Sequence, residues 1–69
     1  MTITILVNGE PRTAPAGLNL EEMLRELGFQ PRLVVVEFNG QILPRRCWAE
    51  QPVVESDALE VVTIVGGGS

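Results

Sequence analysis

Two Asn-Gly dipeptides, Asn8-Gly9 and Asn39-Gly40, constrain the fold of this chain more than any other feature. Asn-Gly between β-branched segments is the strongest local signal for a two-residue hairpin turn, because both turn residues must adopt positive φ. The chain is therefore predicted to contain two β-hairpins. Their strands are expected at 2–7 and 10–14 for the first hairpin, and at 33–38 and 41–44 for the second. Pro11 and Pro15 bracket segment 10–14, so this strand is expected at a sheet edge.

A helix is predicted between the two hairpins. Asn19 is a favourable N-cap, and Glu22 three positions later completes a capping box. Gly28 supplies a left-handed C-cap, and Pro31 prevents the helix from continuing. The apolar residues of this segment share one helical face, which is expected to pack on the sheet. They are Leu20, Met23, Leu24 and Leu27.

The last element is a strand over 59–65, after an irregular segment 45–56 in which Trp48 covers one end of the core. The element order is therefore hairpin, helix, hairpin, strand. A crossover helix between hairpins places the first and last strands side by side and parallel at the sheet centre. The expected fold is α+β, a β-grasp (ubiquitin-like) domain with a mixed sheet of four to five strands on one main helix. The domain is expected to span 1–65, with a flexible Gly-rich tail over 66–69.

Alternation along the strands assigns their two faces, because successive side chains point to opposite sides of a sheet. One face carries the residues expected to pack against the helix: Ile3, Ile5, Val34, Val36, Leu59 and Val61. The other face, marked by Thr2, Thr4, Glu37 and Glu60, also carries Leu6, Val35 and Val62, and with them Leu33 and Ile64. An exposed apolar patch is typical of an interaction site. Leu6, Val35 and Val62 are therefore predicted to form a partner-binding surface beside the C-terminus.

Composition excludes several classes of function. Cys47 is the only cysteine and there is no histidine, so an internal disulfide cannot form, and a metal site or histidine-based catalysis is not expected. Although Arg45 and Arg46 precede Cys47, a cysteine beside a tryptophan is typical of packing, and we assign it no catalytic role. The net charge of −4 argues against nucleic acid and favours a partner protein with a basic face. Without an apolar run of about 20 residues, a soluble, cytoplasmic protein is expected, monomeric when free.

The segments "FNGQILPR" and "SDALEVV", with Trp48 between them and the glycines after them, resemble the ThiS family of sulfur carrier proteins of thiamin thiazole synthesis. The resemblance implies that a ThiF-like enzyme uses ATP to adenylate the C-terminal glycine. Sulfur originating from cysteine then forms a thiocarboxylate, which donates the sulfur to thiazole synthase. By this resemblance the protein is a co-substrate, not an enzyme, and binds no cofactor itself. Its sulfur-carrying end is Gly66, Gly67 and Gly68, expected to be disordered until the activating enzyme binds them.

Two residues depart from the family pattern. Ser69 follows Gly68, where the family usually ends in Gly-Gly, so Ser69 is removed, is tolerated or is foreign to the natural chain. Ser56 stands in a turn where the family often has glycine; if that turn needs positive φ, serine costs about 1 kcal/mol of stability. Other readings stay open. They are a sulfur carrier subunit of molybdopterin synthase, a ubiquitin-like protein modifier and a non-covalent interaction module.

Overall fold

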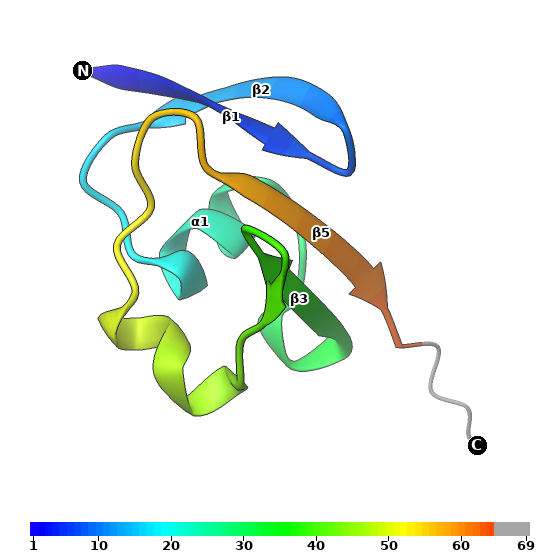
Figure 1. The fold of residues 1–69 in the computed structure, drawn as a ribbon. Coiled ribbons are helices and arrows are strands. Elements are labelled where there is room, and N and C mark those ends of the chain that lie inside the picture. Colours follow the sequence, from blue (N-terminus) through cyan, green and yellow to red (C-terminus); the bar gives the residue numbers. More distant parts are fainter. Residues whose placement is uncertain (65–69) are drawn as a thin grey trace.

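The structure, a computed structural model, describes residues 1–64 and contains one mixed five-stranded sheet with one main helix (Figure 1). Its strand order is β2-β1-β5-β3-β4, in which β1 and β5 are parallel and the other neighbours antiparallel. The predicted α+β, β-grasp fold is confirmed. The elements are β1 (Thr2–Val7), β2 (Glu10–Pro15), α1 (Leu20–Glu26), the 3₁₀ helix η1 (Pro31–Leu33), β3 (Val34–Phe38), β4 (Gln41–Ile42), the 3₁₀ helix η2 (Arg45–Glu50) and β5 (Ala58–Thr63). The predicted domain end at 65 and the tail over 66–69 lie outside the described residues.

Both predicted hairpin turns are present. Asn8 and Gly9 have φ of 53° and 83°, and Asn39 and Gly40 have φ of 52° and 88°. These left-handed values are those of a type I′ turn, whose twist matches that of the flanking strands. Each turn therefore fixes the register of its hairpin, which pairs Val7 with Glu10 in the first and Phe38 with Gln41 in the second.

Helix α1 has the predicted caps at both ends. The Glu22 N–H donates to Oδ1 of Asn19 (2.8 Å), and the Asn19 N–H donates to Oε1 of Glu22 (2.9 Å), which completes the capping box. At the other end Gly28 adopts a φ of 94°. The Gly28 N–H donates to the Arg25 carbonyl (3.0 Å) and the Phe29 N–H to the Leu24 carbonyl (2.9 Å). This pair of bonds is a Schellman motif, which stops the helix sharply.

The segment predicted to be irregular contains a helix that the sequence prediction missed. Arg45–Glu50 forms η2, in which Trp48 is buried and donates from Nε1 to the Leu43 carbonyl (2.8 Å). The Arg45 guanidinium lies above the Trp48 ring, 5.5 Å from its centroid. A short 3₁₀ helix has too few residues to show helical periodicity in the sequence. Burial of Trp48 is what holds this segment against the core.

Strand boundaries differ slightly from the prediction. Leu33 belongs to η1 and not to β3, and the return strand β4 ends at Ile42 and not at Pro44. The backbone still continues beside β3, because the Leu43 N–H donates to the Val36 carbonyl (3.1 Å). β2 is an edge strand, as its prolines indicated.

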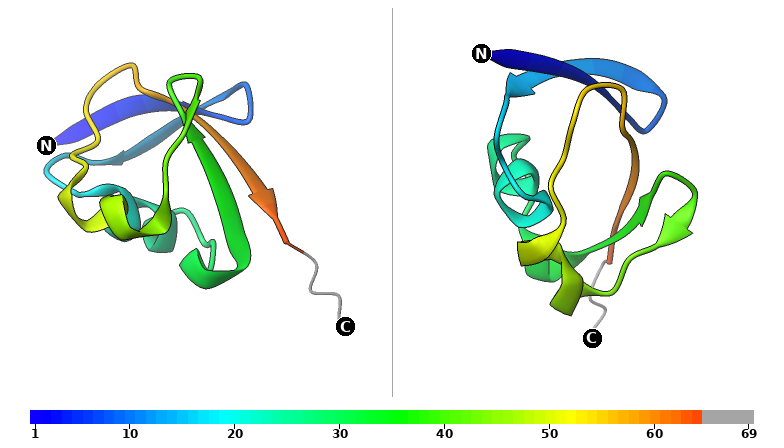
Figure 2. Two further views of the ribbon diagram at one scale, coloured as in Figure 1. Left: turned by 60° about the horizontal axis from the view of Figure 1, so that its bottom comes forward. Right: turned by 60° about the vertical axis from the view of Figure 1, so that its left-hand side comes forward.

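The core lies between α1, η2 and one face of the sheet (Figure 2). Three of the four predicted helix residues are fully buried, and Leu27 packs at the margin. The predicted sheet residues also face the core, with Ile3 at its margin. The buried apolar residues are Ile5, Val7, Ala14, Leu20, Met23, Leu24, Val34, Val36, Trp48, Val53, Leu59 and Val61. Within residues 1–64 no helix covers the opposite face of the sheet (Figure 2), and we call it the open face.

Candidate functional site

Strand β5 runs through the centre of the sheet towards the C-terminal glycines (Figure 1). It is held by β1 on one side and β3 on the other. Just past its end, the Ile64 N–H donates to the Leu33 carbonyl (2.6 Å), so backbone pairing persists to the last described residue. Gly66, Gly67 and Gly68, predicted to carry the sulfur, lie outside the described residues, as does Ser69.

The two turn asparagines also bind β5 with their side chains. Asn8 donates from Nδ2 to the Val61 carbonyl (3.2 Å), and its Oδ1 accepts from the Val61 N–H (2.7 Å). Oδ1 of Asn39 accepts from the Ala58 N–H (2.8 Å). The asparagines therefore satisfy backbone groups of β5 at two points, its first residue and Val61. Sequence reasoning used these residues only for their φ; nothing local in the sequence indicates their long-range bonds.

All three residues predicted for partner binding are exposed on the open face, but only two of them are neighbours. Val35 and Val62 are direct cross-strand partners, with 40% and 62% of their surfaces exposed. Leu6 is also exposed, but it pairs with Ala58, four residues before Val62. Acidic side chains on β3 and β5 stand between Leu6 and the valine pair. The apolar area at the end of β5 thus consists of the valine pair with Leu33 and Ile64, both also exposed.

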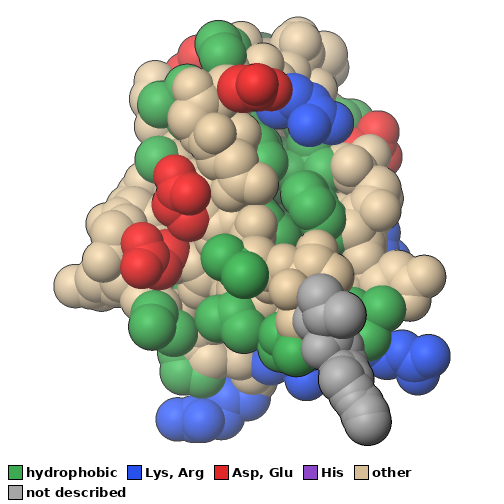
Figure 3. All heavy atoms as spheres, turned by 90° about the vertical axis from the view of Figure 1, so that its right-hand side faces the viewer, with side chains coloured by type: hydrophobic (Ala, Val, Ile, Leu, Met, Phe, Trp, Pro, Cys, Tyr) green, Lys and Arg blue, Asp and Glu red, His purple; other side chains and the backbone are tan. Residues whose placement is uncertain are grey.

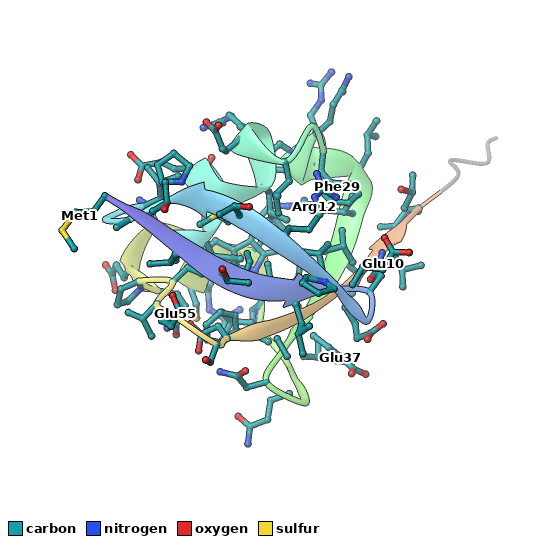
Figure 4. The ribbon with its side chains drawn as sticks, turned by 90° about the horizontal axis from the view of Figure 1, so that it is seen from above. Met1, Glu10, Arg12, Phe29, Glu37 and Glu55 are labelled. Carbon is teal, nitrogen blue, oxygen red and sulfur yellow. The ribbon has the colours of Figure 1, made fainter. Side chains whose placement is uncertain are left out.

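A shallow groove of about 660 Å³ crosses the open face. Its lining comes from three adjacent strands: Val35, Glu37, Ile42, Glu60 and Val62. Figure 3 shows hydrophobic side chains gathered on this side of the molecule, next to acidic ones. Figure 4 places Glu37 on the side of the sheet away from α1. We call these five residues the open-face groove.

Ile42 is the groove residue that the sequence prediction missed. It is 68% exposed and pairs with Glu37 across the β3–β4 hairpin. A two-residue Asn-Gly turn sets that register, and directly opposed residues share a face. The position of the Asn39-Gly40 turn in the sequence was therefore sufficient to predict that Ile42 lies beside Glu37.

The described residues present an exposed apolar and acidic surface, and among them no cluster of possible metal ligands is found. Among residues 1–64 no three His, Cys, Asp or Glu side chains lie close enough together to hold a metal ion. Cys47 is partly exposed and has its own backbone N–H bonded to the Pro44 carbonyl (2.9 Å), inside η2. In the same range, no helix is long and apolar enough to cross a membrane. The chemistry that this surface offers is recognition through apolar contacts and carboxylates.

Comparison with known proteins identifies the family. The family model described as "ThiS family" matches residues 5–68, nearly the whole chain. The chain belongs to the ThiS family. This ThiS-family chain is 30% identical over 64 residues to the sulfur carrier protein ThiS of Escherichia coli, covering 93% of this chain and 97% of that protein. A crystal structure of the thiamine biosynthesis protein ThiS from Geobacter metallireducens has a TM-score of 0.79 and 36% identity, covering 96% of this chain and all of that one.

A thiazole synthase from Paramagnetospirillum magneticum is a relative that is much longer than this chain. It is 42% identical over 65 residues, which make up 94% of this ThiS-family chain but only 20% of that protein. A thiazole synthase from Magnetococcus marinus is 44% identical over 64 residues, again 20% of its length. The chain thus spans about a fifth of the length of the thiazole synthases that it matches.

The ThiS resemblance singled out the turn before β5, and the structure shows its strain. Ser56 has a φ of 74°, a left-handed value that side chains other than Gly, Asn and Asp seldom adopt. The Ser56 N–H donates to the Thr4 carbonyl (2.9 Å), and Oδ2 of Asp57 accepts from the Val54 N–H (2.8 Å). The turn therefore needs positive φ, and serine occupies it at the expected cost in stability.

Proposed function

We propose that this ThiS-family chain is a sulfur carrier of thiamin biosynthesis, which presents sulfur to a thiazole synthase as a thiocarboxylate on its C-terminal glycine. The observation that carries the proposal is the family match through Gly68, which includes the whole glycine run. The similarity to the E. coli sulfur carrier protein along 97% of that protein supports it. The position of β5 also supports it, because the strand that leads into the glycines is the central strand of the sheet, paired with β1 and β3.

In the proposed chemistry the protein is a co-substrate. The glycine carboxylate attacks the α-phosphorus of ATP, pyrophosphate leaves, and an acyl adenylate forms. A sulfide-level donor then attacks the acyl carbon; a C–S bond forms, the C–O bond to phosphate breaks, and AMP leaves. ATP and the catalytic groups belong to a ThiF-like activating enzyme. Glycine suits the reacting end because a chain without Cβ atoms lets its backbone approach a nucleotide closely.

Partner docking is assigned to the open face, around Val35 and Val62. Val62 lies on β5, the strand that leads to the chain end, and Val35 lies on β3, which pairs with β5. Both side chains are exposed. A partner that holds the valine pair therefore also directs the glycines into its own active site. Thiazole synthases that contain a segment similar to this chain support the second partnership, between carrier and synthase.

The first test is mass spectrometry of the protein after incubation with ATP, a ThiF-like enzyme and inorganic sulfide. The expected result is a gain equal to one oxygen-to-sulfur replacement at the C-terminus. Two forms are compared, one ending at Gly68 and one ending at Ser69, and we expect the Gly68 form to react faster. Absence of thiocarboxylate from both forms would contradict the proposal. Attachment to lysines of other proteins would favour a protein modifier instead.

The second test measures docking with a matched pair of variants. Val62 and Val54 are both exposed valines, at 62% and 56%, but Val54 lies in the loop before β5 and away from the groove. Val62→Asp is expected to weaken binding to the adenylating enzyme by at least about 1–2 kcal/mol, as for a modest interface hot spot. Val54→Asp should leave the affinity unchanged. Calorimetric titration with folded proteins decides, and equal affinities would place docking elsewhere.

A further inference from the structure

Two carboxylates lie side by side in the open-face groove. Glu37 on β3 and Glu60 on β5 are direct antiparallel partners, and both side chains are exposed. Opposed residues of this kind have Cβ atoms about 4.5–5.5 Å apart, and like charges at that spacing destabilise a sheet. The only ion pair within residues 1–64 joins Arg25 to Glu21 on α1, so neither groove carboxylate is neutralised by a described cation.

Apolar side chains surround this carboxylate pair. Val35 and Val62 form the next cross-strand pair towards the chain end, and Ile42 stands beside Glu37 on β4. All three are at least 40% exposed. A partner that covers the groove therefore removes water from both the apolar walls and the carboxylates. Desolvated carboxylates without a cation are unfavourable, so a partner that fits must supply positive charge.

We propose that the open-face groove binds an arginine side chain of the adenylating enzyme, its guanidinium lying between Glu37 and Glu60. Guanidinium presents donors around its edge and weakly hydrated planar faces, so it bonds carboxylates and packs against apolar side chains at once. Lysine offers only a compact, strongly hydrated charge. The inference rests on the proposed function in taking the adenylating enzyme as the partner; it adds the chemistry by which that partner is selected.

A second copy of this chain is the other candidate occupant, and charge argues against it. In a two-fold dimer each surface meets the same surface of its mate. Pairing through the groove would place Glu37 and Glu60 of one copy against the same carboxylates of the other. The net charge of −4 adds to this repulsion. Electrostatic complementarity instead favours a basic partner surface and speeds its association.

The test is calorimetric titration of the adenylating enzyme with the double variant Glu37→Gln/Glu60→Gln at low and moderate salt. Loss of both charges is expected to weaken binding at least about tenfold and to flatten its salt dependence. The control Glu26→Gln/Glu50→Gln removes the same charge from exposed sites outside the groove and should bind as wild type. Glu37→Asp/Glu60→Asp, which keeps the charge, should retain part of the affinity.

Three outcomes would overturn the inference. Equal affinity of the double variant and its control would show that the carboxylates bind no cation, even if Val62→Asp still weakens docking. Unchanged salt dependence would show the same. Self-association of the wild type that the double variant strengthens, measured by sedimentation, would assign the groove to a second copy. Thiocarboxylate formation by the wild type is followed separately, so failure of the proposed function is distinguished from failure of the groove.

Discussion

The two faces of the sheet both carry valines but place them in opposite environments. Val34 and Val36 on β3 are 2% and 0% exposed, while Val35 between them is 40% exposed. On β5, Val61 is 6% exposed and Val62 is 62% exposed. The presence of valine therefore does not separate the faces; the pleat does, because neighbours along a strand point to opposite sides.

This comparison teaches what each face contributes. Burial of apolar surface stabilises the fold by about 25 cal/mol per Å², and the helix side receives nearly all of that gain. The open-face valines gain little, and the like charges of the neighbouring Glu37–Glu60 pair repel each other. A face that keeps apolar side chains without burying them is typical of a surface reserved for a partner.

The largest expected difference between the core and the open face comes from a matched pair of leucines. Leu24 is fully buried and Leu6 is 42% exposed on the open face. Leu24→Ala removes core contacts and leaves a cavity, so it should lower the free energy of unfolding by about 2–5 kcal/mol. Leu6→Ala should lower it by less than about 1 kcal/mol. Urea denaturation measures both free energies of unfolding. Similar losses would contradict the difference expected between the core and the open face.

A finer comparison uses neighbouring valines and a substitution of nearly equal shape. Val61→Thr buries a hydroxyl, and we expect a loss of about 1–3 kcal/mol in the free energy of unfolding. Val62→Thr keeps a β-branched side chain in water and should change stability by about 0.5 kcal/mol or less. Thermal unfolding of the two variants under one buffer tests this. A larger loss for Val62→Thr would mean that the open face is covered in the free protein.

The smallest expected effect is on the open face alone, and it is a gain in the free energy of unfolding. Glu60→Gln removes one of two opposed charges, so it should raise the free energy of unfolding by roughly 0.2–1 kcal/mol. The gain should shrink as salt is added, because exposed charges are screened. Chemical denaturation at two salt concentrations gives the measurement. A loss of stability would show that Glu60 has a favourable partner in the free protein, and so would remove one support for a cation-binding groove.

Local signals in the sequence predicted most of the fold. The Asn-Gly turns, the Asn19 capping box and the Gly28 C-cap are chemical requirements of short segments, and each is present. Helix η2 was missed because Trp48 organises it through burial, which has no local periodicity. Alternation predicted which side chains the open face exposes, yet it could not separate Leu6 from the valine pair. That separation depends on the register of β1 against β5, which is set by contacts far apart in the sequence.

The central place of β5 also has a consequence for how the chain folds. Each hairpin pairs residues close in sequence, but the two hairpins touch in the sheet only through the last strand. A growing chain can therefore form β1–β2 and β3–β4 early, yet it cannot join them until Ala58–Thr63 has been synthesised. Pairing β5 with β1 closes the long loop between Leu6 and Ala58, the kind of non-local contact that slows folding. The strand that precedes the C-terminal glycines is thus also the strand that completes the sheet.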